Sequence, residues 1–423
     1  MKVTITPSRL SGTVDAIPSK SHVHRLLIAA AIADAPCTVE CPYLSEDTEA
    51  TARCLNALGA KVNFNGNGFD VTPVSRDGKA ISKPDDTVVL DCGESGSTLR
   101  FLLPVACALG INARFTGKGR LPERPLGGLK ETLQSAGIKF SSDRLPFTVS
   151  GKLSGNMFKV PADVSSQYVS GMLFALAALE SPCTLVTSGK AVSSGYTEMT
   201  VDTLRTFGAD INEENGVYRF GGGRLHSPQT VCVEGDWSNA AFMIAAGVLG
   251  GDVSVRGLNR DSKQKDKAVF DLLADCGADV TFQDGVCRAR KSAFSAIKAD
   301  LTDIPDLAPV LSVLAAVADG ESVFTGVSRL RAKESDRLTA IIENLSSMGI
   351  RTELRSDDEL AIFGGNLKPF CARSFGDHRM VMSAAVAALV CGGEIDDGAP
   401  ISKSYPDFFK ELESLGGKIN ETV

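Results

Sequence analysis

The amino-acid sequence predicts an α/β protein that contains six copies of one module of about 70 residues. Three observations lead to this prediction. A glycine recurs at a nearly constant spacing after amphipathic segments, six almost wholly apolar helical segments interleave with those glycines, and short strand-like runs follow the helices. A helix that is apolar all round is a buried helix, so we expect the apolar helices inside and the sheets outside them.

The recurring glycine follows amphipathic segments such as "LNALGAKVNF" and "LESLGGKIN". Successive glycines are separated by 78, 71, 69, 72 and 67 residues; they are Gly59, Gly137, Gly208, Gly277, Gly349 and Gly416. Glycine adopts the left-handed conformation after a helix C-terminus without the steric cost of a Cβ. Each segment therefore predicts a helix that ends at a glycine and is followed by a strand.

The six apolar segments each have Ser or Asp in the expected N-cap region, where these residues are preferred. They cover residues 19–34, 95–110, 165–180, 236–251, 303–320 and 376–393. Runs such as "CTVEC", "CTLVT", "DVSVRG" and "ESVFTG" follow them and are typical of strands.

Composition excludes several classes of protein. Among the 423 residues, 43% are hydrophobic and 22% charged, and the net charge of −7 argues against nucleic-acid binding. No run of 18 apolar residues suggests a membrane span, and the first residues lack a signal-peptide core. The 11 cysteines include no CxxC pair. We therefore expect free thiols, no metal site and a cytoplasmic location.

Polar and basic residues gather where the apolar helices begin. "PSKSHVHR" supplies Lys20, Ser21 and Arg25, and "GESGSTLR" supplies Gly96. "DVSSQY" supplies Ser165, Ser166 and Gln167, "DIPDLAP" places Asp306 in the expected first helical turn, and "GDHRM" supplies Arg379. Taken singly, each motif is also compatible with simple capping. Together they suit an anionic ligand, because helix N-termini carry unpaired N–H groups and a partial positive charge.

The amphipathic segments carry a second set of charges. "RLPERPLGGLK" contains Arg124, "VSSGYTEM" contains Ser193 and Tyr196, and "SKSYPDF" contains Lys403. "RLRAKESDRL" contains Arg329, Lys333, Glu334 and Arg337. As a charged helix face the last motif is unremarkable. However, cations at the start of a helix oppose its dipole, and a bound anion would remove that conflict.

These motifs, in this order, resemble the 5-enolpyruvylshikimate-3-phosphate synthases, or 3-phosphoshikimate 1-carboxyvinyltransferases, of the enolpyruvyl transferase family. "RAKESDR" and "GDHRM" are the most specific, and the resemblance runs from "PSKSHVHR" to "SKSYPDFFKEL". It implies an inside-out α/β barrel of two domains with three modules each, residues 1–16 plus 236–423 and residues 17–235, with the active site in the cleft between them.

The resemblance implies transfer of the enolpyruvyl group of phosphoenolpyruvate to the 5-hydroxyl of shikimate 3-phosphate, with release of phosphate, in aromatic amino-acid biosynthesis. It implies no metal or organic cofactor and a monomer. The implied catalytic residues are Asp306 as the base, Glu334 as the proton donor, Lys20, and Lys403, which assists or competes with Glu334. The implied shikimate 3-phosphate ligands are Lys20, Ser21, Arg25, Ser165, Ser166, Gln167, Ser193, Tyr196, Asp306, Arg329 and Lys333. The implied phosphoenolpyruvate ligands are Lys20, Gly96, Arg124, Gln167, Arg337, Arg379 and Lys403.

The chain departs from the family pattern in three places. The second motif reads "ESGS", with Glu94 and Ser97, where Asn-Ala/Ser-Gly-Thr is usual. Phe101 stands where Pro is common, and Arg329 where many members have Asn. We expect Glu94 to repel phosphoenolpyruvate unless it is paired. The departures concern substrate affinity and glyphosate sensitivity.

Three alternatives share features with the sequence. An aminosugar enolpyruvyl transferase has the same fold, but it carries a reactive Cys in the loop that here reads "GKGRLPERP". A cyclase acting on RNA ends would need aromatic stacking residues. A ring-shaped DNA clamp would need basic residues on the helices that line its hole, whereas these helices are apolar with charges only at their starts.

Overall fold

The computed structural model describes residues 1–75, 87–124, 126–190 and 192–422. They form two compact units. The split unit consists of Met1–Ile17 and Glu234–Val423, and the continuous unit of Pro18–Val233. The chain thus passes from the first to the second after Ile17 and returns after Val233.

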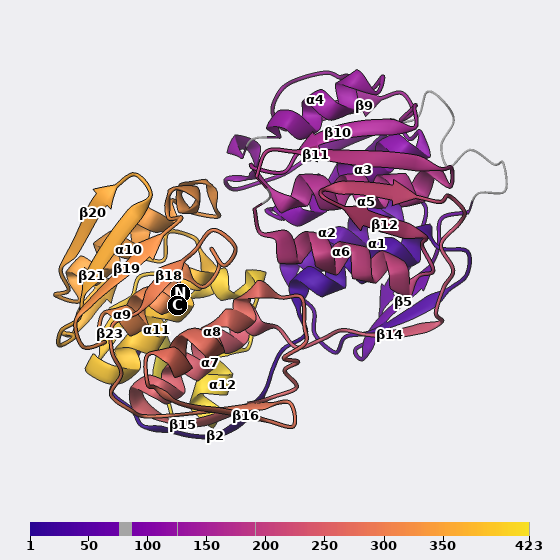
Figure 1. Cartoon of the computed structure of the whole chain (residues 1–423). Helices are drawn as coiled ribbons and strands as arrows, with labels where there is room; N and C mark the ends of the chain where they lie inside the picture. The colour runs from indigo at the N-terminus through magenta and orange to yellow at the C-terminus, as the bar shows by residue number, and fades with distance from the viewer. Residues whose placement is uncertain (76–86, 125, 191, 423) are drawn as a thin grey trace. The chain divides into compact units, whose positions relative to one another are not determined.

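The six predicted modules are confirmed, three in each unit (Figure 1). Each module contains a buried helix, an outer helix and one four-stranded sheet. The buried helices are α1 (Lys20–Ile32), α3 (Gly96–Leu109), α5 (Ser166–Leu179), α7 (Trp237–Gly250), α9 (Ala308–Ala315) and α11 (His378–Cys391). The outer helices are α2 (Glu46–Ala57), α4 (Gly127–Ser135), α6 (Ser194–Thr206), α8 (Ala268–Asp275), α10 (Arg337–Ser347) and α12 (Phe408–Ser414). Short 3-10 turns are η1 (Leu121–Glu123), η2 (Lys265–Lys267), η3 (Ser328–Ala332) and η4 (Ala399–Lys403).

All six sheets have the same strand order. Within each, the first two strands are parallel and the remaining neighbours antiparallel. In the continuous unit the sheets are β14 (Thr230–Cys232)–β3 (Cys37–Glu40)–β5 (Gly68–Thr72)–β4 (Lys61–Phe64), β6 (Val88–Asp91)–β7 (Ala113–Thr116)–β9 (Phe147–Ser150)–β8 (Lys139–Phe140) and β10 (Met157–Pro161)–β11 (Cys183–Ser188)–β13 (Val217–Phe220)–β12 (Ile211–Glu214). In the split unit they are β2 (Leu10–Asp15)–β15 (Gly251–Arg256)–β17 (Val286–Arg290)–β16 (Asp279–Gln283), β18 (Lys298–Asp300)–β19 (Glu321–Thr325)–β21 (Glu359–Phe363)–β20 (Thr352–Ser356) and β22 (Phe370–Ala372)–β23 (Gly393–Ile395)–β1 (Lys2–Thr6)–β24 (Lys418–Thr422).

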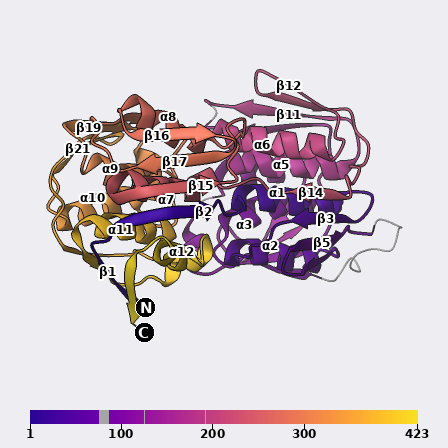
Figure 2. The ribbon, with the colours of Figure 1, turned by 90° about the horizontal axis from the view of Figure 1, so that it is seen from below.

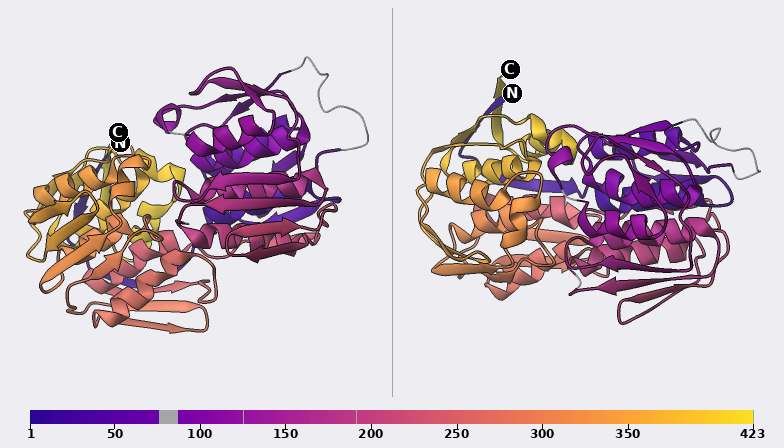
Figure 3. Two further views of the ribbon diagram at one scale, coloured as in Figure 1. Left: turned by 45° about the horizontal axis from the view of Figure 1, so that its top comes forward. Right: turned by 90° about the horizontal axis from the view of Figure 1, so that it is seen from above.

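Three modules draw a strand from a distant part of the chain. β2 precedes α1 in sequence but pairs with β15, whereas β14 precedes α7 but pairs with β3. The sixth sheet is completed by β1, which lies between β23 and β24. The two ends of the chain therefore lie side by side (Figure 3). These exchanges make one unit continuous in sequence and leave the other in two pieces.

The core of each unit is formed by its three buried helices, which contact one another. In the continuous unit these are α1, α3 and α5, with sheets outside them (Figure 2). The six predicted glycines that follow the outer helices all have positive φ, between 77° and 105°. No helix in the described part of the chain is long and apolar enough to cross a membrane.

One expectation about helix limits was wrong. Asp306 does not lie in the first turn of a helix, because α9 begins at Ala308. Asp306 lies instead in a turn closed by a hydrogen bond from Leu307 N–H to Ile304 C=O, 3.0 Å long. Likewise α10 begins at Arg337, so Lys333 precedes that helix.

Candidate active site

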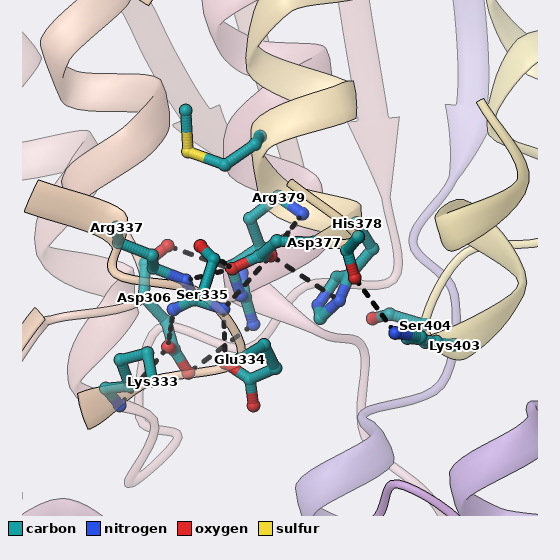
Figure 4. Close-up of polar contacts among 12 residues, drawn as sticks. Asp306, Lys333, Glu334, Ser335, Arg337, Asp377, His378, Arg379, Lys403 and Ser404 are labelled. Carbon is teal, nitrogen blue, oxygen red and sulfur yellow. Dashed lines mark hydrogen bonds and ion pairs between the residues drawn. The ribbon is translucent and has the colours of Figure 1, made fainter. Parts of the chain in front are cut away.

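In the split unit, Arg337 is the centre of a buried ionic cluster (Figure 4). Its side chain is 1% exposed and contacts three carboxylates. Nε donates to Asp377 Oδ2 at 2.8 Å, Nη1 to Asp306 Oδ1 at 2.7 Å and Nη2 to Glu334 Oε2 at 2.7 Å. Burial would lower the pKa of Arg337, but the three carboxylates hold it well above its usual range. Arg337 is therefore a fixed cation.

Three cationic side chains contact the carboxylate of Asp306. Besides Arg337, Lys333 Nζ lies 3.5 Å from Oδ1 and Arg379 Nη2 lies 3.5 Å from Oδ2. Arg379 also donates to the backbone C=O of Asp306 at 3.4 Å. Burial would raise the pKa of Asp306, but the cations hold it well below its usual range. Asp306 is thus a carboxylate in this arrangement.

Asp377 holds the arginines of this cluster in place. It is the N-cap of α11, where Oδ1 accepts the Arg379 N–H at 3.0 Å, and Oδ2 also accepts the Ser335 hydroxyl at 3.0 Å. Its side chain is fully buried. Sequence reasoning did not select this residue, although "GDHRM" places an N-cap Asp directly before the buried helix.

Three further charged residues, Lys403, Asp266 and Arg329, lie near this cluster. Lys403, at the end of η4, donates to the Gly376 C=O at 2.9 Å. Asp266 is buried, and its carboxylate accepts a hydrogen bond from the Ser238 hydroxyl. Burial and then the negative charge of Asp306 raise the pKa of Asp266 to about 6. Arg329 donates to Thr302 C=O at 2.6 Å, and its charge interacts with that of Asp306.

In the continuous unit, the cations lie at the starts of α1 and α3. Lys20, the first residue of α1, lies 2.8 Å from Asp47 Oδ2. Gly96 is the first residue of α3, and two guanidinium groups flank it. A Cβ at Gly96 would lie 2.7 Å from Arg100 Nη1 and 2.8 Å from Arg124 Nη1. Only a glycine permits this approach of two cations to the helix N-terminus.

Gln167 connects this site to the start of α5. Its Oε1 accepts from Arg100 Nη1 at 2.7 Å, and its Nε2 donates to Ser97 Oγ at 2.9 Å. Ser165 is the N-cap of α5, with its hydroxyl accepting the Gln167 N–H at 3.3 Å, and Ser166 begins the helix. Arg100, the last residue of the motif "GESGSTLR", was not among the site residues predicted from the sequence.

Arg25 is buried among neutral oxygens. Its Nε donates to Thr200 Oγ1 at 2.8 Å, Nη1 to Ser21 C=O at 2.6 Å and Nη2 to Tyr196 C=O at 2.7 Å. Burial lowers its pKa to about 10, so it remains protonated at neutral pH. Tyr196 and Ser193 belong to the start of α6, where Ser193 is a buried N-cap residue at φ 52°. A buried cation that contacts neutral groups is suited to bind an anion.

Glu94 points toward the loop before η1. A Cβ at Gly119 would lie 2.5 Å from the Glu94 carboxyl carbon. A backbone hydrogen bond links the same two segments, because Lys118 N–H donates to Gly93 C=O at 2.8 Å. The carboxylate that was expected to repel phosphoenolpyruvate therefore lies against a loop backbone.

Comparison with known proteins places this architecture first in a class. The structure is similar to the enolpyruvyl transferase NikO of Streptomyces tendae, with a TM-score of 0.78 and 21% identity over 100% of this chain and 98% of that one. The six α/β modules in two units thus have the fold of an enolpyruvyl transferase.

A family model then identifies the particular family. The model of EPSP synthase (3-phosphoshikimate 1-carboxyvinyltransferase) matches residues 5–412. A Clostridium novyi relative named 3-phosphoshikimate 1-carboxyvinyltransferase is 36% identical over 99% of this chain and 98% of its own. The EPSP synthase of Acinetobacter baumannii has a TM-score of 0.81 at 25% identity, over 99% of this chain and 100% of that one. The chain belongs to the EPSP synthase family, enzymes that transfer an enolpyruvyl group in the shikimate pathway.

Proposed function

We propose that this chain transfers the enolpyruvyl group of phosphoenolpyruvate to the 5-hydroxyl of shikimate 3-phosphate, and that residues of both units act on one pair of substrates. One observation carries the proposal beyond family membership. A chain with a net charge of −7 places Arg100 and Arg124 together at the start of α3, and Lys20 at the start of α1. The two substrates carry phosphates and carboxylates, which such groups bind well.

Shikimate 3-phosphate would be held mainly by the continuous unit. We assign its carboxylate to Arg25, whose guanidinium contacts neutral oxygens in this structure. Hydroxyl and amide donors at the starts of three helices, α1, α5 and α6, would bind its phosphate and ring hydroxyls; they are Ser21, Ser165, Ser166, Gln167, Ser193 and Tyr196. Lys20, Arg329 and Lys333 would complete the set from the remaining cations.

Phosphoenolpyruvate would be bound by arginines from both units. Gly96 N–H, Arg124, Gln167 and Lys20 would contribute from the continuous unit, and Arg337, Arg379 and Lys403 from the split unit. The planar guanidinium suits bidentate contacts to carboxylate and phosphate. Arg337 and Arg379 would exchange part of their contacts with Asp306 for contacts with the substrate anion.

This exchange would also activate the base. A carboxylate held by three cations is a weak base, because its pKa lies well below its usual range. When a substrate anion takes over those cations, the pKa of Asp306 rises toward its usual range. Asp306 then accepts the proton of the 5-hydroxyl while the oxygen bonds to C2 of phosphoenolpyruvate.

A second group must protonate the methylene carbon in the same step. We propose Glu334 as that donor, with Lys403 as the rival. The tetrahedral intermediate then loses a proton from the new methyl group and expels phosphate, which restores the double bond. No oxidant or reductant is required by this addition and elimination.

Phosphate release tests the function directly. Purified protein is incubated with shikimate 3-phosphate and phosphoenolpyruvate, and with each omitted in turn. Release that requires both substrates supports the proposal. Release with UDP-N-acetylglucosamine in place of shikimate 3-phosphate would assign the chain to the aminosugar reaction instead.

We further propose that the enzyme is a cytoplasmic monomer. The described cysteines are all free thiols, and nine of them are partly or fully buried, as suits a reducing compartment. Light scattering coupled to gel filtration measures the mass in solution, and a value near twice 44.5 kDa would contradict the monomer.

A further inference from the structure

A buried chain of hydrogen bonds links three helices of the continuous unit. His24 Nδ1 on α1 lies 2.7 Å from Thr51 Oγ1 on α2, which lies 2.6 Å from Thr98 Oγ1 on α3. Thr98 Oγ1 in turn lies 2.7 Å from the hydroxyl of Ser95, the N-cap of α3. Each of the four side chains is at most 1% exposed. The chain therefore ends at the residue that precedes Gly96.

The donor of each hydrogen bond along this chain can be assigned by counting the hydrogens that each group carries. Thr98 Oγ1 donates to Ser95 Oγ and reaches the Asp47 C=O at 3.5 Å, an acceptor that has no hydrogen to give. Because a hydroxyl has one hydrogen, Thr98 must accept from Thr51. Thr51 must then accept from His24. His24 is thereby the tautomer that carries its hydrogen on Nδ1.

The other ring nitrogen agrees with this assignment. His24 Nε2 is buried and has no hydrogen-bond partner among the described residues. In the opposite tautomer this nitrogen would be a buried N–H donor without an acceptor, which is rarer and more costly than an acceptor without a donor. Burial also lowers the pKa of His24 to about 3, despite the opposing charge of Asp47, so the ring is neutral at physiological pH.

A second side-chain contact, between Lys20 and Asp47, links α1 and α2 one helical turn away from the contact of His24 with Thr51. Lys20 and His24 are four residues apart on α1, and their partners Asp47 and Thr51 are four residues apart on α2. Thr98 contacts both partners, through the Asp47 C=O and the Thr51 hydroxyl. Lys20, the start of α1 and the start of α3 thus belong to one hydrogen-bonded assembly.

We propose that His24 is a positioning residue: as the neutral Nδ1–H tautomer it fixes the start of α3 at Gly96 relative to Lys20, through Thr51 and Thr98. The functional part of this inference rests on the proposed function, in which Lys20 and Gly96 both contact phosphoenolpyruvate. His24 itself contacts no substrate. Its loss changes how the two groups are aligned, and a small misalignment is costly in a site that depends on orientation.

The first test reads the tautomer and does not need activity. Long-range 1H–15N spectra of protein labelled with 15N-histidine distinguish Nδ1–H from Nε2–H for each of the four histidines. We expect the His24 ring to show Nδ1–H from pH 5 to 8 without titration. Its signals are those lost in His24→Asn, or those left after His22, His226 and His378 are assigned by their own variants. An Nε2–H ring, or titration in that range, would overturn the proposal.

The second test compares two substitutions at position 24 in the phosphate-release assay. Asn keeps an N–H donor near the Nδ1 position, whereas Leu removes it. We expect His24→Leu to raise the KM for phosphoenolpyruvate about tenfold with kcat changed far less, and His24→Asn to stay close to the parent protein. His226→Asn, whose ring is largely exposed, is the matched control.

Thr98→Val provides a separate break in the same chain. It should raise the KM for phosphoenolpyruvate as His24→Leu does, and the double variant should add little to either. Unchanged KM in His24→Leu and Thr98→Val, with only a lower melting temperature, would show a purely structural role and refute the proposal. If the parent protein releases no phosphate, the proposed function fails, whereas the spectra still decide the state of His24.

Discussion

Arg337 Nη1 lies 2.7 Å from Asp306 Oδ1. The proposed base therefore forms an ion pair with an arginine that we also assign to the substrate. Arg337 also contacts Glu334 and Asp377, and its charge is neutralised within the protein. A substrate anion therefore competes with carboxylates of the chain for the same guanidinium.

We predict that Asp306→Asn has opposite effects on turnover and on binding. Turnover should fall by about 10²-fold or more, because the base is lost. Phosphoenolpyruvate should bind more tightly in the presence of shikimate 3-phosphate, because one competitor for Arg337 is removed. Phosphate release gives the turnover and calorimetry the dissociation constant. Asp357→Asn, at an exposed position of the same unit, is the control, and weaker binding by Asp306→Asn would contradict the competition.

Asp377→Ala should destabilise the protein at pH 7 by about 3–5 kcal/mol, because it leaves a buried guanidinium with one partner fewer. The pKa of Asp377 is lowered in the folded state, since Arg337 and His378 outweigh the effect of burial. A carboxylate with a lowered folded pKa stabilises the protein above its unfolded value of about 4. This stabilisation is lost as pH falls through the folded pKa.

Urea unfolding at several pH values measures this dependence. The difference between the parent protein and Asp377→Asn, which keeps the size of the cap, should be largest near pH 7 and should shrink below pH 4. A difference that does not change with pH would show that the charge of Asp377 is not what stabilises the cluster.

Arg25→Met and Arg337→Met should separate ligand binding from stability. Arg25 contacts neutral oxygens, so its replacement should change the urea midpoint little but raise the KM for shikimate 3-phosphate by roughly 10²-fold, since a charged hydrogen bond is lost. Arg337→Met leaves buried carboxylates unpaired and should lower the urea midpoint strongly. Equal losses of stability in both variants would refute the distinction.

Isotope exchange should identify the donor of the methylene proton. Protonation of the methylene carbon in D2O followed by reversal places deuterium in phosphoenolpyruvate, which NMR detects. We expect Glu334→Gln to suppress this exchange more than Lys403→Ala does, when both are compared at saturating substrate. The reverse order would assign the proton to Lys403.

Much of the fold could be predicted because its signals are local. A glycine after a helix needs a positive φ, and Gly59, Gly208 and Gly349 have φ of 97°, 77° and 81°. The exchange of β2 and β14 could not be predicted in this way, since pairing between strands about 190 to 240 residues apart in the sequence leaves no local pattern. The position of Asp306 was missed because the turn at Ile304–Leu307 delays the helix.

Part of the candidate site could also be predicted from the sequence. Cations before apolar helices predicted anion binding, and the structure brings Arg124 to Gly96 and Lys333 to Asp306. The sequence did not predict that carboxylates of the chain would already occupy Arg337, because that depends on how Asp377 and Glu334 pack.

The different connectivity of the two units implies an order of folding during synthesis. The continuous unit has all its strands within Pro18–Val233 and can fold once that stretch has emerged. In the split unit, Lys2 of β1 pairs with Thr422 of β24, so its last sheet closes only when the end of the chain is made. At about 5–20 residues per second, the first strand waits roughly 20–80 s for this partner. During that interval β1 presents unpaired edges, whereas β2 does so only until β15 has been made. We expect the nascent chain to need chaperones mainly to protect these edges.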